Sequence, residues 1–239
     1  KPNSHSRRHR PSRASRSRLL RRFNRLSRPR VVQVSRVHND PKVLLTGTTT
    51  VGIVTKEGVV LATDRRVTAG YYIAHRRGRK IWKIDNHVAA TMSGAVADVQ
   101  MILNELTHLA MDYKITHQAP VPIKTLANYA SVIMFYSRPM IYIAHMIIGG
   151  VDNEEGPVLY AVDWYGSFTR EERFMSTGSG SPTAFGVLED GYRDGMSLDE
   201  AVKLAVRAVR AAMLHDPGSG EGVDVITITK EAGYREIQV

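Results

Sequence analysis

The residues best suited to chemistry lie at one abrupt boundary in the chain. An arginine-rich segment ends at Gly47, and a regularly patterned, largely apolar chain begins at Thr48. We interpret this boundary as a cleavage site between Gly47 and Thr48. Cleavage there would leave Thr48 as the first residue of the body, and its hydroxyl could then act as a nucleophile.

Other polar residues stand at the ends of predicted strands. Taken singly, each has an ordinary structural explanation: Asp64 before two arginines can be a turn residue, Lys80 a solvated charge, and Asp216-Pro217 the end of a helix. Their position at strand ends is what makes them candidates as a group. The candidate set is Thr48, Asp64, Lys80, Ser176, Asp216 and Ser219.

The sequence excludes several other chemistries. It has no cysteine, which removes disulfides, thiolate metal sites and cysteine nucleophiles. No nucleotide-binding loop, serine-hydrolase elbow or zinc-protease motif is present. The nine histidines form no ligand-spaced cluster in the body, so we expect neither a metal nor a cofactor. The longest apolar run, residues 140–148, is too short to span a membrane and contains His145.

The charge of the chain is divided unevenly. The formal net charge is +10, but residues 1–47 hold 14 basic residues and one acid, a net charge of +13. The body, residues 48–239, therefore has a net charge of −3. The basic character belongs to the leading segment alone.

Three interpretations of the leading segment stay open. Residues 1–30 are rich in Arg, Ser and Pro and poor in apolar residues, so we expect disorder. The segment could be a removable leader, an anion-binding tail or a targeting sequence. Phe23 is its single aromatic residue, which weakens the hypothesis of nucleic-acid binding by base stacking.

The body begins with strands. Polar turns separate short β-branched or apolar runs, a pattern that predicts hairpins. Later runs predict more strands, with turns at Gly149-Gly150 and Tyr165-Gly166. The predicted strands cover residues 48–55, 59–65, 80–84, 88–92, 141–148, 158–164, 168–175 and 223–229, the last of which closes the chain.

Four helices are expected between these strands. Apolar residues recur at three- and four-residue intervals over 95–113, and a second helix over about 122–137 ends before Pro139. A third begins near Ser181-Pro182. The fourth follows Ser197, which forms a capping box with Glu200.

The order of elements is strands, two helices, strands, two helices, strand. Because no β-α-β alternation occurs, the pattern favours two packed sheets with helices outside over a doubly wound parallel sheet. We predict an α+β protein in which residues 48–239 form one domain and residues 1–47 a leader.

The order and spacing of several blocks resemble proteasome β subunits of the archaeal type. The resemblance covers essentially residues 47–237. Its blocks are GTTTVGI at 47–53, GVVLATDRR at 58–66, GRKI at 78–81, MSGAVAD at 92–98 and STGSG at 176–180. It implies an N-terminal-nucleophile hydrolase with a four-layer αββα sandwich, in agreement with the order of elements.

The resemblance also implies catalytic roles. Thr48 would be the nucleophile, and its α-amine, freed by self-cleavage after Gly47, would be the general base. Asp64 would pair with Lys80, and Lys80 would favour deprotonation of the Thr48 hydroxyl. The remaining roles are implied in the same way: Ser176, Asp216 and Ser219 would orient the α-amine and water, and the Gly94 amide would donate to the oxyanion.

Substrate binding is implied at four positions. Val67, Met92 and Val96 would form an apolar pocket for the side chain before the cut bond, and Thr68 would contact the substrate backbone. Cleavage after hydrophobic residues is therefore expected.

Partners follow from the same resemblance. We expect stacked heptameric rings with α subunits and other β subunits, an unfolding ATPase, unfolded protein substrates and a cytoplasmic location, without membrane or nucleic-acid binding. Two alternatives remain: a structural β subunit that cuts poorly, opposed by the complete set of catalytic positions, and a nucleic-acid-binding protein, supported by the tail alone.

Overall fold

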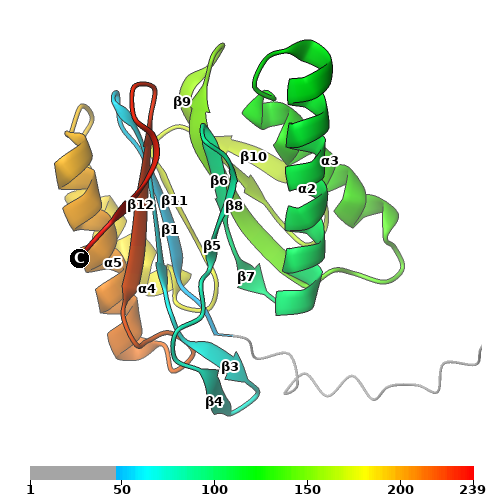
Figure 1. Cartoon of the computed structure of the whole chain (residues 1–239). Coiled ribbons are helices and arrows are strands. Elements are labelled where there is room, and N and C mark those ends of the chain that lie inside the picture. The colour runs from blue at the N-terminus through cyan, green and yellow to red at the C-terminus, as the bar shows by residue number, and fades with distance from the viewer. Residues whose placement is uncertain (1–46) are drawn as a thin grey trace, which may run out of the picture. The chain divides into compact units, whose positions relative to one another are not determined.

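The computed structural model describes residues 47–239, and two antiparallel sheets form the centre of this part of the chain (Figure 1). The leader predicted over residues 1–47 lies outside the described residues except for Gly47. Helices cover the outer faces of both sheets, so the order of layers is helix, sheet, sheet, helix. The predicted αββα sandwich is confirmed.

The first sheet contains the strands that present Thr48 and Asp64. Its five strands run in the order β11-β1-β2-β12-β13, and every neighbouring pair is antiparallel. β2 is buried along its whole length because it lies inside the sandwich. The bounds are β1 Thr50–Val54, β2 Gly58–Asp64, β11 Phe174–Thr177, β12 Val223–Thr229 and β13 Gly233–Ile237.

The second sheet has six strands in the order β10-β9-β8-β6-β5, with a two-residue strand, β7, paired to β8 off this path. A separate hairpin of β3 and β4 extends from the end of β2. The bounds are β3 Val67–Ala69, β4 Tyr72–His75, β5 Ile81–Asp85, β6 Val88–Thr91, β7 Ser93–Gly94, β8 Ala144–Asp152, β9 Gly156–Val162 and β10 Phe168–Glu171.

Each helical layer packs on its own sheet. α2 (Val96–His117) and α3 (Ile123–Tyr136) bury Leu103, Leu106 and Leu126 against the second sheet. α4 (Ser181–Gly191) and α5 (Leu198–His215) cover the first sheet. The predicted capping box is confirmed: Ser197 Oγ accepts from the Glu200 amide at the start of α5.

A third apolar cluster joins the two sheets. Leu61 of β2, Ile147 of β8 and Ile226 of β12 are all buried between them. Burial of a side chain of this size contributes about 1.5–3 kcal/mol. The two sheets are thus packed together along β2, the strand that ends at Asp64.

Some sequence predictions were wrong. Residues 168–175 were predicted as one strand but form β10 and β11, which belong to different sheets. Gly149 and Gly150 were predicted as a turn but lie inside β8. A Cβ on Gly150 would lie 2.1 Å from the carbonyl oxygen of His87, so glycine is needed there for close strand packing. The hairpin β3–β4 and the closing strand β13 were not predicted.

Candidate active site

Thr48 lies immediately before β1, and its side chain meets a lysine. The residue is only 4% exposed. Lys80 Nζ, just before β5, donates a hydrogen bond to Thr48 Oγ1 at 3.0 Å. Thr48 Oγ1 donates in turn to the carbonyl oxygen of Gly47 at 2.6 Å. The hydroxyl therefore lies between a cationic donor and the peptide bond that precedes it.

Asp64 fixes this lysine. Asp64 is fully buried, and its Oδ1 accepts from Lys80 Nζ at 2.8 Å and from the Thr49 amide at 2.9 Å. Its Oδ2 accepts from the amides of Arg66 at 3.0 Å and Gly220 at 2.9 Å. These four hydrogen-bond donors compensate the free-energy cost of burying the carboxylate, a cost that a lone buried charge would bear in full. The carboxylate thus joins β1, β2 and the loop before β12.

Burial and charge oppose each other at Lys80. Desolvation lowers the pKa of Lys80 from its ordinary value, while the adjacent Asp64 carboxylate raises it, with burial the larger effect. Asp216 also raises this pKa, and Arg66 lowers it. Lys80 is therefore more easily deprotonated than a surface lysine.

A chain of hydrogen bonds holds the backbone nitrogen of Thr48. The Thr48 amide donates to Ser179 Oγ at 3.1 Å, and Ser179 Oγ donates to Asp216 Oδ2 at 2.7 Å. Ser219 Oγ donates to the same Asp216 oxygen at 2.6 Å and lies 2.7 Å from Thr49 Oγ1. Two of the three residues predicted to orient the amine, Asp216 and Ser219, are thus joined to it through neighbours.

Ser176 does not reach the site. It lies in β11, and its Oγ donates to the carbonyl oxygen of Thr50 at 2.8 Å. The described hydrogen bonds thus place Ser179, three residues further on, at the Thr48 nitrogen in the position predicted for Ser176. This difference has a physical cause, because Ser176 is still in β11, whereas Ser179 lies in the turn after the strand, where the chain approaches Thr48.

The predicted substrate residues gather beside Thr48. One pocket is lined by Thr48 and Lys80 together with Val67, Thr68, Met92, Gly94 and Val96. Thr68 Oγ1 accepts from the Gly47 amide at 2.9 Å. Gly94 has φ of +121°, and a Cβ there would lie 2.1 Å from the carbonyl oxygen of Ile143, so a side chain is excluded. Val67, Met92 and Val96 supply apolar surface in this pocket, and the threonine and lysine supply polar groups.

Comparison with known proteins agrees with this geometry. The family model for proteasome subunits matches residues 44–228. The chain belongs to the proteasome subunit family. Its relatives are β subunits, and it is accordingly a threonine-type endopeptidase of the N-terminal-nucleophile class.

Three relatives show how far the similarity extends. A proteasome subunit beta 1 from Caldivirga maquilingensis is 94% identical over 205 residues, which are 86% of this chain and the whole of that relative. A proteasome subunit beta 1 from Pyrobaculum calidifontis is 63% identical over 190 residues, 80% of this chain and 94% of that relative. A proteasome subunit beta 2 from Staphylothermus marinus is 48% identical over 188 residues, 78% of this chain and 89% of that relative.

Glycines around Ser179 could have indicated this missed residue of the proteasome subunit. A Cβ on Gly178 would lie 2.1 Å from the carbonyl oxygen of Thr48, and one on Gly180 would lie 2.0 Å from Thr49 Oγ1. A serine between two glycines after a strand is typical of a hydroxyl brought close to another backbone. Arg66 also lines the Thr48 pocket. It was missed because, in the sequence, it resembles an ordinary surface charge.

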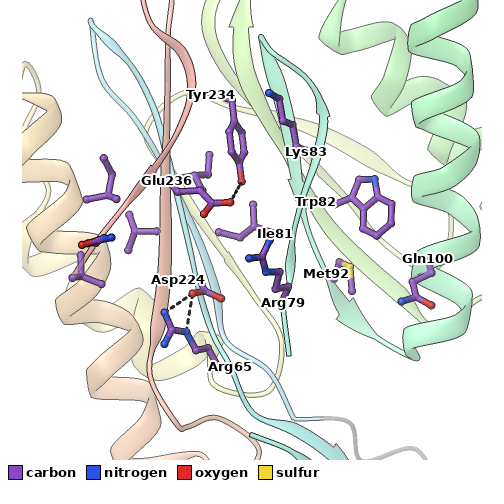
Figure 2. A pocket seen from close by; sticks show the side chains of 15 residues that line it. Arg65, Arg79, Ile81, Trp82, Lys83, Met92, Gln100, Asp224, Tyr234 and Glu236 are labelled. Atoms are coloured by element: carbon purple, nitrogen blue, oxygen red, sulfur yellow. Dashed lines mark hydrogen bonds and ion pairs between the residues drawn. The ribbon is translucent and has the colours of Figure 1, made fainter. Parts of the chain in front are cut away.

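A larger groove of the proteasome subunit shares Met92 with the pocket of Thr48. Figure 2 shows it between β13 and β5, with Tyr234 and Glu236 on one side and Trp82 on the other. Arg65 and Asp224 form an ion pair within it at 2.6 Å. Neither the nucleophile nor Lys80 lines this groove. Within residues 47–239, no helix is long and apolar enough to cross a membrane, and no group of three metal-ligating side chains occurs.

Proposed function

We propose that this chain is a precursor that cuts itself between Gly47 and Thr48 and then hydrolyses peptide bonds through Thr48. The observation that supports this most directly is the position of Thr48 Oγ1, 2.6 Å from the Gly47 carbonyl oxygen and 3.0 Å from Lys80 Nζ. Nucleophile, scissile peptide and cation are adjacent before any substrate binds.

Self-cleavage is an acyl shift followed by hydrolysis. Thr48 Oγ1 attacks the carbonyl carbon of Gly47, the C–N bond breaks, and the hydroxyl proton ends on the Thr48 nitrogen. The product is an ester between Gly47 and Thr48 Oγ. One water then hydrolyses the ester, which leaves the Gly47 carboxyl group and a Thr48 with free hydroxyl and free α-amine.

The cut creates the general base. An amide nitrogen has no available lone pair, whereas an α-amine has an ordinary pKa of about 7.7–8.0, close to neutral pH. In turnover, the amine takes the proton of Oγ, Oγ attacks the substrate carbonyl, and the amine passes the proton to the leaving nitrogen. Water, deprotonated by the same amine, hydrolyses the acyl-enzyme.

The surrounding residues take distinct roles in this scheme. Lys80, paired with Asp64, stabilises the developing alkoxide. Ser179, Asp216 and Ser219 orient the amine and the water. The Gly94 amide donates to the oxyanion, a contribution of about 3–4 kcal/mol in comparable sites.

The pocket supports cleavage after hydrophobic residues. Val67, Met92 and Val96 present apolar surface, and Met92 is flexible enough to fit side chains of several shapes. Thr68, whose hydroxyl binds the Gly47 amide in the precursor, would bind the backbone of a substrate in the same way.

Assembly follows from the family. The relatives are proteasome β subunits, and we propose that this chain stacks with α subunits and other β subunits in heptameric rings of a 20S core. An ATPase docked on the α ring would supply unfolded proteins in the cytoplasm. Enclosure of substrates in a chamber suits a body with a small net charge.

The test is co-expression with its α subunits, followed by intact-mass measurement of the assembled particle. We expect a chain that starts at Thr48 and cuts peptides after hydrophobic residues. Thr48→Ala should assemble, remain uncut and lack peptidase activity. A particle whose wild-type chain begins before residue 48 yet is active, or a Thr48→Ala particle that still cuts, would overturn the proposal.

A further inference from the structure

The carboxylate of Glu221 joins two parts of the active site that the mechanism above treats separately. Its Oε1 accepts from Arg66 Nη2 at 3.0 Å and from Arg76 Nη1 at 2.8 Å. Arg66 follows the strand that ends in Asp64, and Arg76 follows β4 of the β3–β4 hairpin. One oxygen therefore links a residue of the Thr48 pocket to a residue of the hairpin.

The loop that contains Glu221 also holds the residues around the Thr48 nitrogen. It runs from Asp216 to Gly222 and includes Ser219. On one side the Gly220 amide donates to Asp64. On the other side Arg66 Nη1 donates to the carbonyl oxygen of Pro217 at 2.8 Å. The loop is thus held by hydrogen bonds to the Asp64 carboxylate and to the Arg66 guanidinium.

The backbone conformation of Glu221 indicates that its side chain has a role in the protein. Glu221 has φ of +67°, a left-handed conformation that a residue with a Cβ adopts at a cost in free energy. Glycine would occupy this position without strain, and the loop has glycine at the alternate positions Gly218, Gly220 and Gly222. A glutamate at the strained position points to a role for the carboxylate.

Arg66 depends on this carboxylate. The Arg66 side chain is 22% exposed, and its Nε is buried without a hydrogen-bond partner among the described residues. A partly buried guanidinium needs a counter-charge to remain in place. Arg66 also acts electrostatically on Lys80 and lowers its pKa, so a change in the charge around Arg66 reaches the catalytic lysine.

The other end of the link lies on the substrate side. Arg76 and the pocket residues Val67 and Thr68 line one cleft with the rest of the hairpin. Val67 and Thr68 also line the pocket of Thr48, so this cleft continues to the nucleophile. A substrate that moves the hairpin would therefore change the position of the Glu221 carboxylate through its hydrogen bond to Arg76.

We propose that Glu221 is a positioning residue that couples the substrate-binding hairpin to the loop of Asp216 and Ser219 through Arg76 and Arg66. It touches neither substrate nor the reacting atoms. The inference rests on the proposed roles of Asp216 and Ser219 in holding the Thr48 amine. It adds a residue outside the catalytic set and predicts that substrate binding and amine placement are energetically linked.

The test compares Glu221→Gln, Glu221→Gly and Arg76→Gln in the full chain assembled with its α subunits. Each should slow both processing at Thr48 and kcat by about threefold or more, while assembly is unchanged. Glu221→Gly is the decisive variant, because it removes the carboxylate together with the rest of the side chain and at the same time relieves the backbone strain. The double variant Glu221→Gln/Arg76→Gln should be no slower than the slower single variant.

The pH profile separates positioning from a general loss of stability. Lys80 is influenced by Asp64, Asp216 and Arg66, and removal of the Glu221 charge leaves Arg66 less compensated. The pKa values of Lys80 and of the amine should then fall, so the pH–kcat profile should move to lower pH in Glu221→Gln. Asp224→Asn breaks the nearby Arg65–Asp224 pair and should leave rate and profile unchanged.

The outcomes distinguish this inference from the proposed function. If the wild-type chain is cut at Thr48 and Thr48→Ala is inactive, the proposed function stands. If Glu221→Gly and Arg76→Gln then match the wild type in rate and pH profile, the coupling through Glu221 is overturned. Additive effects in the double variant would likewise overturn it.

Discussion

The backbone nitrogen of Thr48 donates to Ser179 Oγ at 3.1 Å while Thr48 is still joined to Gly47. The atom that would become the general base is therefore already held in place before the chain is cut. Cleavage would change the chemistry of this nitrogen without requiring it to move. Such preorganisation reduces the entropy lost in reaching the reactive geometry.

The first prediction separates Ser179 from Ser176. Ser179→Ala removes the hydrogen bond to the amine, and hydrogen bonds to charged groups contribute about 1.5–3 kcal/mol. We expect kcat of the assembled particle to fall about 10- to 100-fold. Ser176→Ala should leave kcat unchanged and lower the free energy of unfolding by about 1 kcal/mol, because it loses the bond to Thr50. The reverse ranking in kcat would show that Ser176 acts at the amine.

The second prediction concerns the residue before the cut. A Cβ on Gly47 would lie 1.9 Å from Gly218 Cα, so Gly47→Ala must displace the scissile peptide or the loop of Asp216. Processing followed by mass spectrometry should slow about 10- to 100-fold, the cost of a displacement near 1 Å at a reacting group.

This variant provides its own control, since residue 47 is removed by the cut. Once processed, the Gly47→Ala chain is identical to the mature wild type and should have the same kcat. Gly186→Ala in α4 is a matched substitution, because a Cβ there meets nothing within 4 Å. It should process normally and gain about 0.5–1 kcal/mol of stability. Equal processing of both variants and the wild type would refute the argument from close packing.

The sandwich could be predicted from the sequence, whereas the contacts within the site could not. Periodicity revealed α5 and its capping box because both depend on residues close in sequence. Residues 168–175 were predicted as one strand across the four charged residues 170–173, and the structure divides them there between two sheets at Glu172 and Arg173.

The same limit applies to the catalytic residues. Asp64 could be proposed by resemblance, but its two backbone donors from outside β2, Thr49 and Gly220, depend on how distant segments pack. The hydrogen bond of Ser179, and not of Ser176, to the Thr48 nitrogen could not be predicted for the same reason. The strand ends between them, and a sequence does not show at which residue the chain turns toward Thr48.

The third prediction follows from the pKa of Lys80. Burial lowers this pKa below its ordinary value of 10.5, so the unfolded chain binds more protons than the folded chain between the two pKa values. The contribution of Lys80 to folding stability should therefore rise with pH through that window and be constant below it. The difference in the free energy of unfolding between the wild type and Lys80→Met, measured with urea, should therefore grow in favour of the wild type as the pH is raised toward 10.5.

Other groups titrate in the same range, which makes the difference between the two chains the informative quantity. Burial raises the pKa of Tyr234 to about 12, and this residue is present in both. Asp64, unpaired in Lys80→Met, should make that variant less stable at every pH from neutral upward. A stability difference that stays flat across the window would contradict the lowered pKa of Lys80.

The fourth prediction tests the apolar pocket. Met92 is 8% exposed and lines the pocket beside Thr48 together with Val67 and Val96. Met92→Arg would place a cation among apolar groups, where a substrate carboxylate could neutralise it. We expect kcat/KM for peptides with Leu before the cut bond to fall about 10- to 100-fold and that for the matching Glu peptides to rise.

Met92→Leu is the matched control, since it keeps both volume and polarity and should retain the preference for Leu. Processing at Thr48 must be measured for both variants, because Gly47 rather than a large residue precedes the cut and should be accepted by either pocket. If Met92→Arg is processed and still prefers Leu over Glu, then Met92 does not contact the substrate side chain. The selectivity would then belong to other residues of the wider cleft along the β3–β4 hairpin, which His75, Arg76 and Arg77 also line.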